Sequence, residues 1–349
     1  MQIKRLINRD FLIWILFPLS LFYRGIVCWR NLFYNFGFFI SRRLPCYVIS
    51  VGNITAGGTG KTPMVMFLAK LIKKYGKNVA ILSRGYGRKT KGTILVTDGN
   101  SKLKSNFKDC GDEPYLLANT LKGIPLVVDN DRFRGGMYLI KKFKPQIIIL
   151  DDGFQHRSLE RDLDLVLVSA IDRINDHKLL PYGILREPWE NISRADAIIV
   201  TKTNLKKPKS FLYRKLSKTN KILINSKMES VISPLKKHLN SENRCLKNKR
   251  VFIFSAIGDP ASFILSIEKL GAIICGKKEF NDHYIYSQMD LINIDRIASK
   301  TDAEYLITTE KDWVKIENFK SKYNIIVLEA KISLSNEVQF KKLLLPFIS

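Results

Sequence analysis

Residues 46–62 read CYVISVGNITAGGTGKT, and this stretch decides the fold of the chain. A β-forming run leads into a glycine-rich loop, and an apolar stripe at helical spacing follows from Met64 to Ile72. A strand, a glycine-rich loop and a helix in this order form the context of a phosphate-binding loop. Glycines let backbone N–H groups turn toward an anion, and the helix N-terminus adds its dipole. The residues expected to bind a nucleotide are Thr55, Ala56, Gly57, Gly58, Thr59, Gly60, Lys61 and Thr62.

The match to the general pattern GxxxxGK[ST] departs at one position, because Thr55 stands where the first glycine is expected. Three glycines at 57, 58 and 60 compensate for it. In this pattern the lysine, Lys61, reaches the β- and γ-phosphates and the hydroxyl of Thr62 binds Mg²⁺. The alternative is a glycine-rich turn that only starts a helix.

Outward from this loop, short runs rich in Ile and Val alternate with helical patterns. The candidate strands are 46–51, 78–82, 126–128, 146–150, 163–168 and 197–201. Strands of this kind, alternating with helices, predict a mostly parallel sheet that is covered on both faces. The predicted fold class is therefore α/β, of the P-loop NTPase type.

A second α/β series follows a basic connecting loop at 235–250. Its candidate strands are 250–255, 272–275, 304–307 and 324–328, with helices near 260–270 and 287–299. We predict three parts: an N-terminal helical segment (1–44), a larger domain that carries the phosphate loop (45–228) and a smaller α/β domain (229–349).

Residues 144–152 read KPQIIILDD, an apolar strand that ends in two carboxylates. P-loop proteins place an acid at the end of a neighbouring strand to organise Mg²⁺. Asp151 and Asp152 are the candidates for this metal site. The alternative is that they cap a helix or form a turn.

The N-terminus contains FLIWILFPLSLFY at 11–23, thirteen residues without a charge. A helix of this length spans about 20 Å, which is shorter than the roughly 30 Å hydrocarbon core of a bilayer. Pro18 lies within it and Arg24 follows directly. We expect a helix that lies in the interface of an anionic membrane. The alternatives are a helix packed on the protein's own core, a true span, or a signal peptide.

The 349 residues include 58 Lys+Arg against 32 Asp+Glu, a formal charge of +26. Such a charge favours acidic partners: nucleic acid, anionic lipid or phosphorylated metabolites. A compositional bias toward Lys explains it equally well. The most basic run, 202–227, is interpreted as a solvated surface or as a second patch facing lipid or phosphate.

Three classes of P-loop protein fit these residues. GTPases read guanine with an Asn/Thr-Lys-x-Asp element, but residues 201–204 are TKTN, with Asn204 in place of the Asp. ParA/MinD-type ATPases carry a signature lysine at the position of Ala56. A small-molecule kinase is the class that remains.

Together the motifs resemble the tetraacyldisaccharide 4'-kinase family over nearly the whole chain. The matching segments are SVGNITAGGTGKTP (50–63), ILSRGYGR (81–88), GDEPYLLA (111–118), DR (131–132), LDDGFQHRSLERDLDLVLV (150–168), LLPYGILREP (179–188), RADAIIVTK (194–202) and FNDHYIYS (280–287). GDEP, DDGFQHR and LREP are more specific than the phosphate loop. The chain departs from the family at 182–184, where Tyr-Gly-Ile replaces a proline-rich form.

The resemblance implies ATP and Mg²⁺ as cofactors and transfer of the γ-phosphoryl group to a sugar 4'-hydroxyl of an acylated disaccharide 1-phosphate. It also implies a peripheral or monotopic protein at the cytoplasmic face of the inner membrane. We expect a monomer and no nucleic-acid partner. The competing hypothesis is a membrane-recruited P-loop switch that phosphorylates no small molecule.

The same resemblance implies the catalytic residues. Asp112 of GDEP is the candidate base, with His283 as its partner, although 171 positions separate them. Without the family, Asp112 is equally well explained as a helix cap and His283 as a loop residue. Arg186 is the candidate arginine finger. Further candidates for phosphate or substrate contact are Arg84, Arg132, Gln155, His156 and Arg157.

Overall fold

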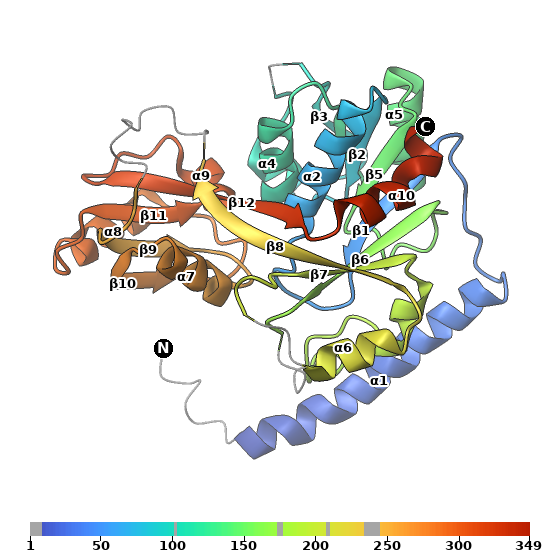
Figure 1. Ribbon diagram of the computed structural model, residues 1–349, viewed down its shortest axis with the longest axis horizontal. Helices are drawn as coiled ribbons and strands as arrows, with labels where there is room; N and C mark the ends of the chain where they lie inside the picture. The colour runs from blue at the N-terminus through green and yellow to red at the C-terminus, as the bar shows by residue number, and fades with distance from the viewer. Residues whose placement is uncertain (1–8, 101–102, 173–176, 207–209, 234–244) are drawn as a thin grey trace.

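The computed structural model describes residues 9–100, 103–172, 177–206, 210–233 and 245–349 (Figure 1). The predicted segment at 1–8, most of the predicted connecting loop at 235–250, and Lys207 and Lys209 of the basic run lie outside the described residues. The described chain forms two α/β lobes that share one sheet.

The sheet has twelve strands in the order β10-β9-β11-β12-β8-β7-β6-β1-β5-β2-β4-β3. The strands of the first lobe are β1 (Tyr47–Asn53), β2 (Val79–Ser83), β3 (Ile94–Thr97), β4 (Leu126–Val128), β5 (Ile147–Asp151), β6 (Leu163–Ser169) and β7 (Ala197–Thr201). Those that follow are β8 (Ile222–Ile232), β9 (Arg250–Ser255), β10 (Ile273–Glu279), β11 (Tyr305–Thr309) and β12 (Asn324–Leu334).

Neighbouring strands pair in parallel except at two places among the described residues, β3–β4 and β8–β12. The long strands β8 and β12 run antiparallel from Ser226–Leu334 to Ile232–Leu328, and they join the two lobes. Figure 1 shows β8 crossing from one lobe to the other. β1 lies between β6 and β5, and its chain continues to β2 beyond β5. The order of the strands along the sheet therefore reverses at β1. At such a position the loops that follow the carboxyl ends of the strands form a crevice where α/β proteins bind ligands.

Helices cover both faces of the first lobe. The helices here are α2 (Lys61–Lys74), α3 (Phe107–Cys110), α4 (Asp112–Thr120), α5 (Arg132–Phe143), α6 (Ser210–Ser217), the 3₁₀ helix η3 (Trp189–Arg194) and α10 (Glu337–Ile348). α2, α4 and α10 bury apolar side chains against one face, together with Ile49 and Ile149 of the sheet. α5 and α6 cover the other face. Full coverage explains why these strands are apolar at nearly every position.

The second lobe repeats this layering on a smaller scale. Its helices are α7 (Pro260–Lys269), α8 (Gln288–Ala298) and α9 (Glu310–Ile316). α8 packs on one face of the sheet through Leu291 and Ile294, and α7 packs on the other through Phe263 and Ile267. Side chains of Asp259 and Ser287 cap the first turns of α7 and α8, which supports the helix starts that the sequence suggested.

The first helix, α1 (Arg9–Asn35), lies along the outside of the first lobe, with Pro18 inside it (Figure 1). Among the described residues, no helix has both the length and the apolar character needed to cross a bilayer. Twelve large apolar side chains between Ile15 and Ile40 are 42–78% exposed.

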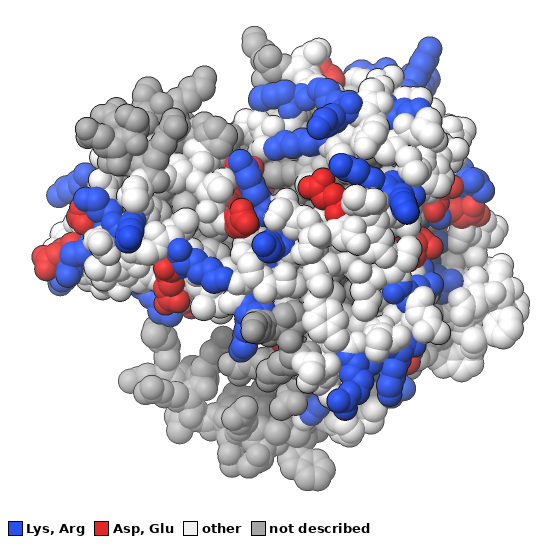
Figure 2. All heavy atoms as spheres, viewed as in Figure 1, with Lys and Arg blue, Asp and Glu red and all other residues white. Residues whose placement is uncertain are grey.

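Basic side chains are spread over both lobes in several groups, with acidic side chains between them (Figure 2). Lys202 of the basic run is 2% exposed, so the interpretation of the whole run as a solvated surface is wrong at this position. Lys215 is half-buried, and its Nζ lies 3.9 Å from the centroid of the Trp189 ring.

The predicted fold class, mixed α/β with a large and mostly parallel sheet, is confirmed. All six expected strands of the first series and all four of the second are present, and their ends differ from the predicted ones by zero to six residues. The sequence analysis missed β3, β8, α6, α9 and α10. The predicted domain boundary at 228/229 falls inside β8, and the three-part division stays a prediction.

Candidate functional site

The phosphate loop leaves β1 at Asn53 and enters α2 at Lys61. Gly57 and Gly60 have φ angles of 115° and 92°, which L side chains rarely adopt. The side-chain amide of Asn53, through Nδ2, donates to the carbonyl of Thr55 (2.6 Å) and to Oγ1 of Thr59 (3.0 Å). These two hydrogen bonds connect the two ends of the loop. The loop therefore has a fixed shape in which the glycines occupy the positions that need them.

The structure explains why Thr55 can stand where the pattern GxxxxGK[ST] has its first glycine. Thr55 forms an isolated antiparallel bridge with Leu185, and the flanking amides of Ala56 and Arg186 donate to Ile184 (2.6 Å) and Ile54 (2.8 Å). The backbone at Thr55 is thus extended and paired, and it does not need the freedom of a glycine. The segment from Leu179 to Arg186 instead supports this end of the loop.

Lys61 points toward a carboxylate at the end of the neighbouring strand. Its Nζ lies 3.6 Å from Oδ1 of Asp152 and 3.3 Å from Oδ1 of Asn53. Nη1 of Arg186 donates to both carboxylate oxygens of Asp152, at 3.0 and 2.8 Å. Burial opposes ionisation of Asp152, but the charges of Lys61 and Arg186 outweigh it and lower its pKa. The structure thus brings Lys61, Asp152 and Arg186 together.

Asp151, the last residue of β5, is in a different electrostatic position. Ser83 donates to its Oδ2 (2.9 Å), and its buried Oδ1 has no hydrogen-bond partner among the described residues. Burial, reinforced by the negative charges of Glu113 and Asp152, raises the pKa of Asp151 to about 7. A buried carboxylate oxygen without a donor is a suitable ligand for a hard cation.

These residues fit Mg²⁺. The described part of the chain contains no cluster of three or more His, Cys, Asp or Glu side chains arranged to hold a metal. Mg²⁺ in nucleotide enzymes does not need one, because it usually binds one or two carboxylates together with substrate phosphates and water. Asp151 and Thr62, at the start of α2, stay the candidate donors, and Asp152 is already paired with two cations.

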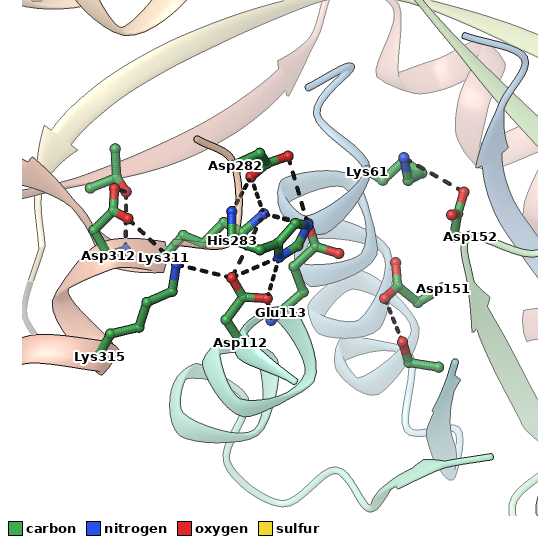
Figure 3. Close-up of polar contacts among 12 residues, drawn as sticks. Lys61, Asp112, Glu113, Asp151, Asp152, Asp282, His283, Lys311, Asp312 and Lys315 are labelled. Atoms are coloured by element: carbon green, nitrogen blue, oxygen red, sulfur yellow. Dashed lines mark hydrogen bonds and ion pairs between the residues drawn. The ribbon is translucent and has the colours of Figure 1, made fainter. Parts of the chain in front are cut away.

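Asp112 and His283 are hydrogen-bonded across the two lobes (Figure 3). Nδ1 of His283 lies 2.9 and 3.0 Å from the two carboxylate oxygens of Asp112. Asp112 is the first residue of α4, whose N-cap is Gly111, so the explanation of Asp112 as a helix cap is wrong. His283 lies in the loop after β10 with a φ of 61°. The pairing implied by the resemblance is therefore present.

The pKa values of the pair move in opposite directions. Burial is the largest single influence on each group and disfavours its charge. The mutual hydrogen bond and the neighbouring charges outweigh burial, so the pKa of Asp112 is lowered and the pKa of His283 is raised. Both shifts favour a carboxylate beside an imidazolium.

Two lysines of α9 surround this pair, and the sequence analysis missed both. Nζ of Lys311 lies 3.1 Å from both Glu113 and Asp282 and 3.9 Å from Asp112. Nζ of Lys315, which is almost fully buried, lies 3.2 Å from Asp112. Their spacing of four residues places them on one helix face. This was the available signal, but only the packing of α9 on α4 shows that the face points at Asp112 (Figure 3).

The remaining predicted residues have local partners. Arg132 is buried, and its Nη1 donates to the carbonyls of Asp129 and Asn130, each at 3.1 Å. Burial and the charge of Arg84, which is exposed, lower the pKa of Arg132 to about 10. The side-chain amide of Gln155 donates to the carbonyl of Asn53 (2.8 Å), the residue at which the phosphate loop begins.

His156 and Arg157 have hydrogen-bond partners outside the phosphate loop. Nε2 of His156 lies 2.9 Å from Oγ of Ser158, and burial with nearby arginines lowers the pKa of His156 to about 4. Arg157 donates to the carbonyl of Asn31 (3.0 Å) and to Oδ1 of Asn35 (2.8 Å), so it is bound to α1. Substrate contact by these residues stays a prediction.

Lys202 joins the second lobe to the phosphate loop. Its ammonium donates to the carbonyl of Gly58 and to Oδ2 of Asp259. Asp259 precedes α7, so the ion pair crosses between the lobes. The second position of the TKTN stretch, considered above as a weak guanine-reading element, thus supports the loop backbone.

The phosphate loop lies where the strand order of a parallel sheet reverses, and the adjoining strand ends in an acidic side chain. The two lobes together supply a charged Asp–His pair. This combination defines a P-loop phosphotransferase. The model of the LpxK family, described as tetraacyldisaccharide-1-P 4'-kinase, matches residues 12–349. The chain belongs to this family.

Relatives and a solved structure agree with this assignment. The chain is 39% identical to tetraacyldisaccharide 4'-kinase of Aquifex aeolicus, over 94% of this chain and 97% of that protein. It is 34% identical to the enzyme of the same name from Desulfotalea psychrophila, over 95% of each. A crystal structure of LpxK from Aquifex aeolicus in complex with ATP matches with a TM-score of 0.76 at 37% identity, covering 95% of this chain and 98% of that one.

Proposed function

We propose that this chain transfers the γ-phosphoryl group of ATP to the 4'-hydroxyl of a tetraacylated disaccharide 1-phosphate, a step of lipid A biosynthesis. Membership of the family supports this reaction. The observation that carries it is the Asp112–His283 pair, in which the first lobe supplies a buried carboxylate and the second lobe supplies the imidazole. A nucleotide switch needs no such pair, because it transfers the phosphoryl group to water.

The loop amides and Lys61 bind and orient the triphosphate. Arg186, held beside Lys61 by Asp152, stabilises negative charge on the transferring group. Asp151 and Thr62 hold Mg²⁺, which neutralises phosphate charge when bound. A sugar hydroxyl is a weak nucleophile, so a base must accept its proton as transfer proceeds. Asp112 accepts this proton at a carboxylate oxygen, and Nδ1 of His283 keeps the carboxylate oriented.

The outer face of α1 suits a membrane surface. The exposed apolar side chains between residues 15 and 40 lie beside Arg24, Arg30, Arg42 and Arg43, a combination that binds anionic interfaces. We propose that the protein acts as a monomer, peripherally at the cytoplasmic face of the inner membrane, with this face of α1 toward the lipid. The protein should sediment with vesicles that contain phosphatidylglycerol; equal recovery with neutral vesicles would contradict an electrostatic contribution.

The decisive experiment is turnover in detergent micelles. Protein with ATP and Mg²⁺ should produce a 4'-phosphorylated disaccharide. Asp112→Asn should lower kcat by on the order of 10²–10⁴, while ATP affinity measured by calorimetry is retained. Asp302→Asn, at an 89% exposed side chain, is the matched control and should behave as wild type. ATP hydrolysis without a phosphorylated lipid would favour the switch hypothesis instead.

A further inference from the structure

Helix α1 presents two unlike faces, and its inner face is bound to the segment that carries Arg186. Ser20, Tyr23, Val27 and Asn31 follow one another at spacings of three and four residues, so they lie on one side of the helix. Oγ of Ser20 donates to the carbonyl of Leu179 at 3.0 Å. The hydroxyl of Tyr23 donates to the carbonyl of Arg186 at 2.7 Å.

The residue after Arg186 is a second point of attachment. Glu187 is fully buried, and its carboxylate accepts from Nη2 of Arg194 at 3.0 and 2.9 Å. Nδ2 of Asn31 on α1 donates to the same carboxylate at 3.1 Å, and Nδ2 of Asn191 at 2.9 Å. A buried charge with this many donors is costly to disturb. The backbone at 186–187 is therefore fixed by α1 on one side.

On its other side the same backbone is fixed to the phosphate loop. The amide of Arg186 donates to the carbonyl of Ile54 (2.8 Å). With both main-chain groups of Arg186 bonded, its guanidinium reaches Asp152, whose other partner is Lys61. A continuous set of contacts thus runs from α1 through the main chain of Arg186 to the phosphate site.

We propose that α1 is a positioning element of the phosphate site, in which the Tyr23 hydroxyl and the Asn31–Glu187 contact hold Arg186 in its catalytic orientation. This inference rests on the proposed function, because it assumes that Arg186 acts on the transferring phosphoryl group. Tyr23 and Glu187 are positioning residues, since they act through Arg186. The role of α1 is therefore not limited to its exposed apolar face.

The test is a double-mutant cycle on kcat in micelles, with Tyr23→Phe, Arg186→Ala and the double variant. Loss of one hydrogen bond should lower kcat about three- to tenfold, with the ATP KM changed less than twofold. In the Arg186→Ala background, Tyr23→Phe should have no further effect. Cys28→Ser changes an exposed side chain of the same helix, and its kcat should stay within twofold of wild type.

Two results overturn the inference while leaving the role of Arg186 intact. One is an unchanged kcat in Tyr23→Phe; the other is an equal loss in the wild-type and Arg186→Ala backgrounds, which would indicate a general structural effect. Glu187→Gln supplies a second cycle and should show the same dependence on Arg186. If Arg186→Ala itself is fully active, the proposed role of Arg186 fails and the inference fails with it. An impaired Arg186→Ala with an additive Tyr23→Phe refutes the inference alone.

Discussion

At the scale of single residues, two adjacent carboxylates have opposite roles. Asp152 is neutralised by Lys61 and Arg186, whereas Asp151 has a buried oxygen that receives no hydrogen bond within the described chain. Sequence analysis placed both in one metal site, because two neighbouring aspartates at a strand end are equivalent until their surroundings are known. Only the fold shows which of the two retains a free oxygen.

Replacing Asp151 should therefore stabilise the nucleotide-free protein while removing activity. A folded-state pKa of about 7 means that the folded protein holds a proton that the unfolded chain releases near pH 4, so Asp151 costs stability as pH rises from 4 to 7. Asp151→Asn should raise the free energy of unfolding at pH 8 by about 4 kcal/mol and should change it little at pH 4. Its kcat should fall by more than about 100-fold.

Urea unfolding without nucleotide measures this difference. Asp152→Asn is the control of opposite sign, because its lowered pKa reports a carboxylate that the fold stabilises. It should lose stability at pH 8. A loss of stability in both variants would show that Asp151 is satisfied in the folded protein.

The two histidines of the predicted site should respond to pH in opposite ways. The pKa of His283 is raised, so its contribution is fully present below its unfolded value near 6.5 and is lost as pH rises through the folded value. His283→Ala should therefore cost more stability at pH 6 than at pH 9. The pKa of His156 is lowered to about 4, so the unfolded chain gains a proton first and His156→Ala should cost less at pH 6 than at pH 9. Denaturant titrations at both pH values check this; parallel trends would contradict it.

At the scale of elements, the last helix completes the core of the first lobe. Phe340 and Leu344 of α10 are buried among side chains of α2, and the rings of Phe340 and Phe67 lie 6.0 Å apart. Phe340→Ala should lower the free energy of unfolding by about 3–5 kcal/mol and weaken ATP binding, because α2 carries the phosphate loop. Val338→Ala, at a 66% exposed position of the same helix, should change stability by less than about 0.5 kcal/mol. Thermal unfolding with and without ATP measures both.

The elements differ in how far the sequence predicts them. Strands such as β5 are short apolar runs between turn residues. Helices such as α2 carry apolar residues at helical spacing. Local sequence patterns are therefore enough to predict these elements. β8 was not predicted, and β12 was predicted too short. The solvent-facing positions of these strands include Lys227, Glu229 and Lys331, so the sequence there does not resemble a buried strand. The pairing of β8 with β12 stabilises both as strands. α10 has no local signal that assigns it to the first lobe rather than the second.

The residues of the candidate site also differ in how far the sequence predicts them. The phosphate loop and its strand-end acids are contiguous motifs, and spacing alone predicts them. The Asp112–His283 pair spans 171 positions, so it required the family resemblance. Lys311, Lys315 and Lys202 required the fold itself, because each acts across the boundary between the lobes and no local pattern separates them from surface lysines.

At the scale of the whole molecule, the ion pair of Lys202 and Asp259 holds the second lobe against the phosphate loop. Lys202 is 2% exposed, and a buried charge that loses its partner is strongly unfavourable. Asp259→Asn should raise the dissociation constant for ATP by about tenfold, since the ammonium also holds the carbonyl of Gly58. Isothermal titration calorimetry measures this change.

An exposed ion pair of the second lobe supplies the control. Lys249 and Glu304 lie 2.8 Å apart, with side chains 42% and 40% exposed, and such pairs contribute about 0–1 kcal/mol. Glu304→Gln should leave ATP binding unchanged. An Asp259→Asn variant with wild-type affinity would show that the second lobe does not support the phosphate loop through Lys202.

The path of the chain also determines when the molecule can form during synthesis. The chain leaves the first lobe along β8 and returns to it along β12, directly before α10. The second lobe is therefore an insertion, and the catalytic lobe is built from two distant portions of the polypeptide. The first lobe can close its core only after the second lobe has been synthesised, because α10 follows that lobe in the chain and covers α2. A nascent chain that has not yet reached α10 therefore leaves apolar surface of the nucleotide-binding lobe uncovered.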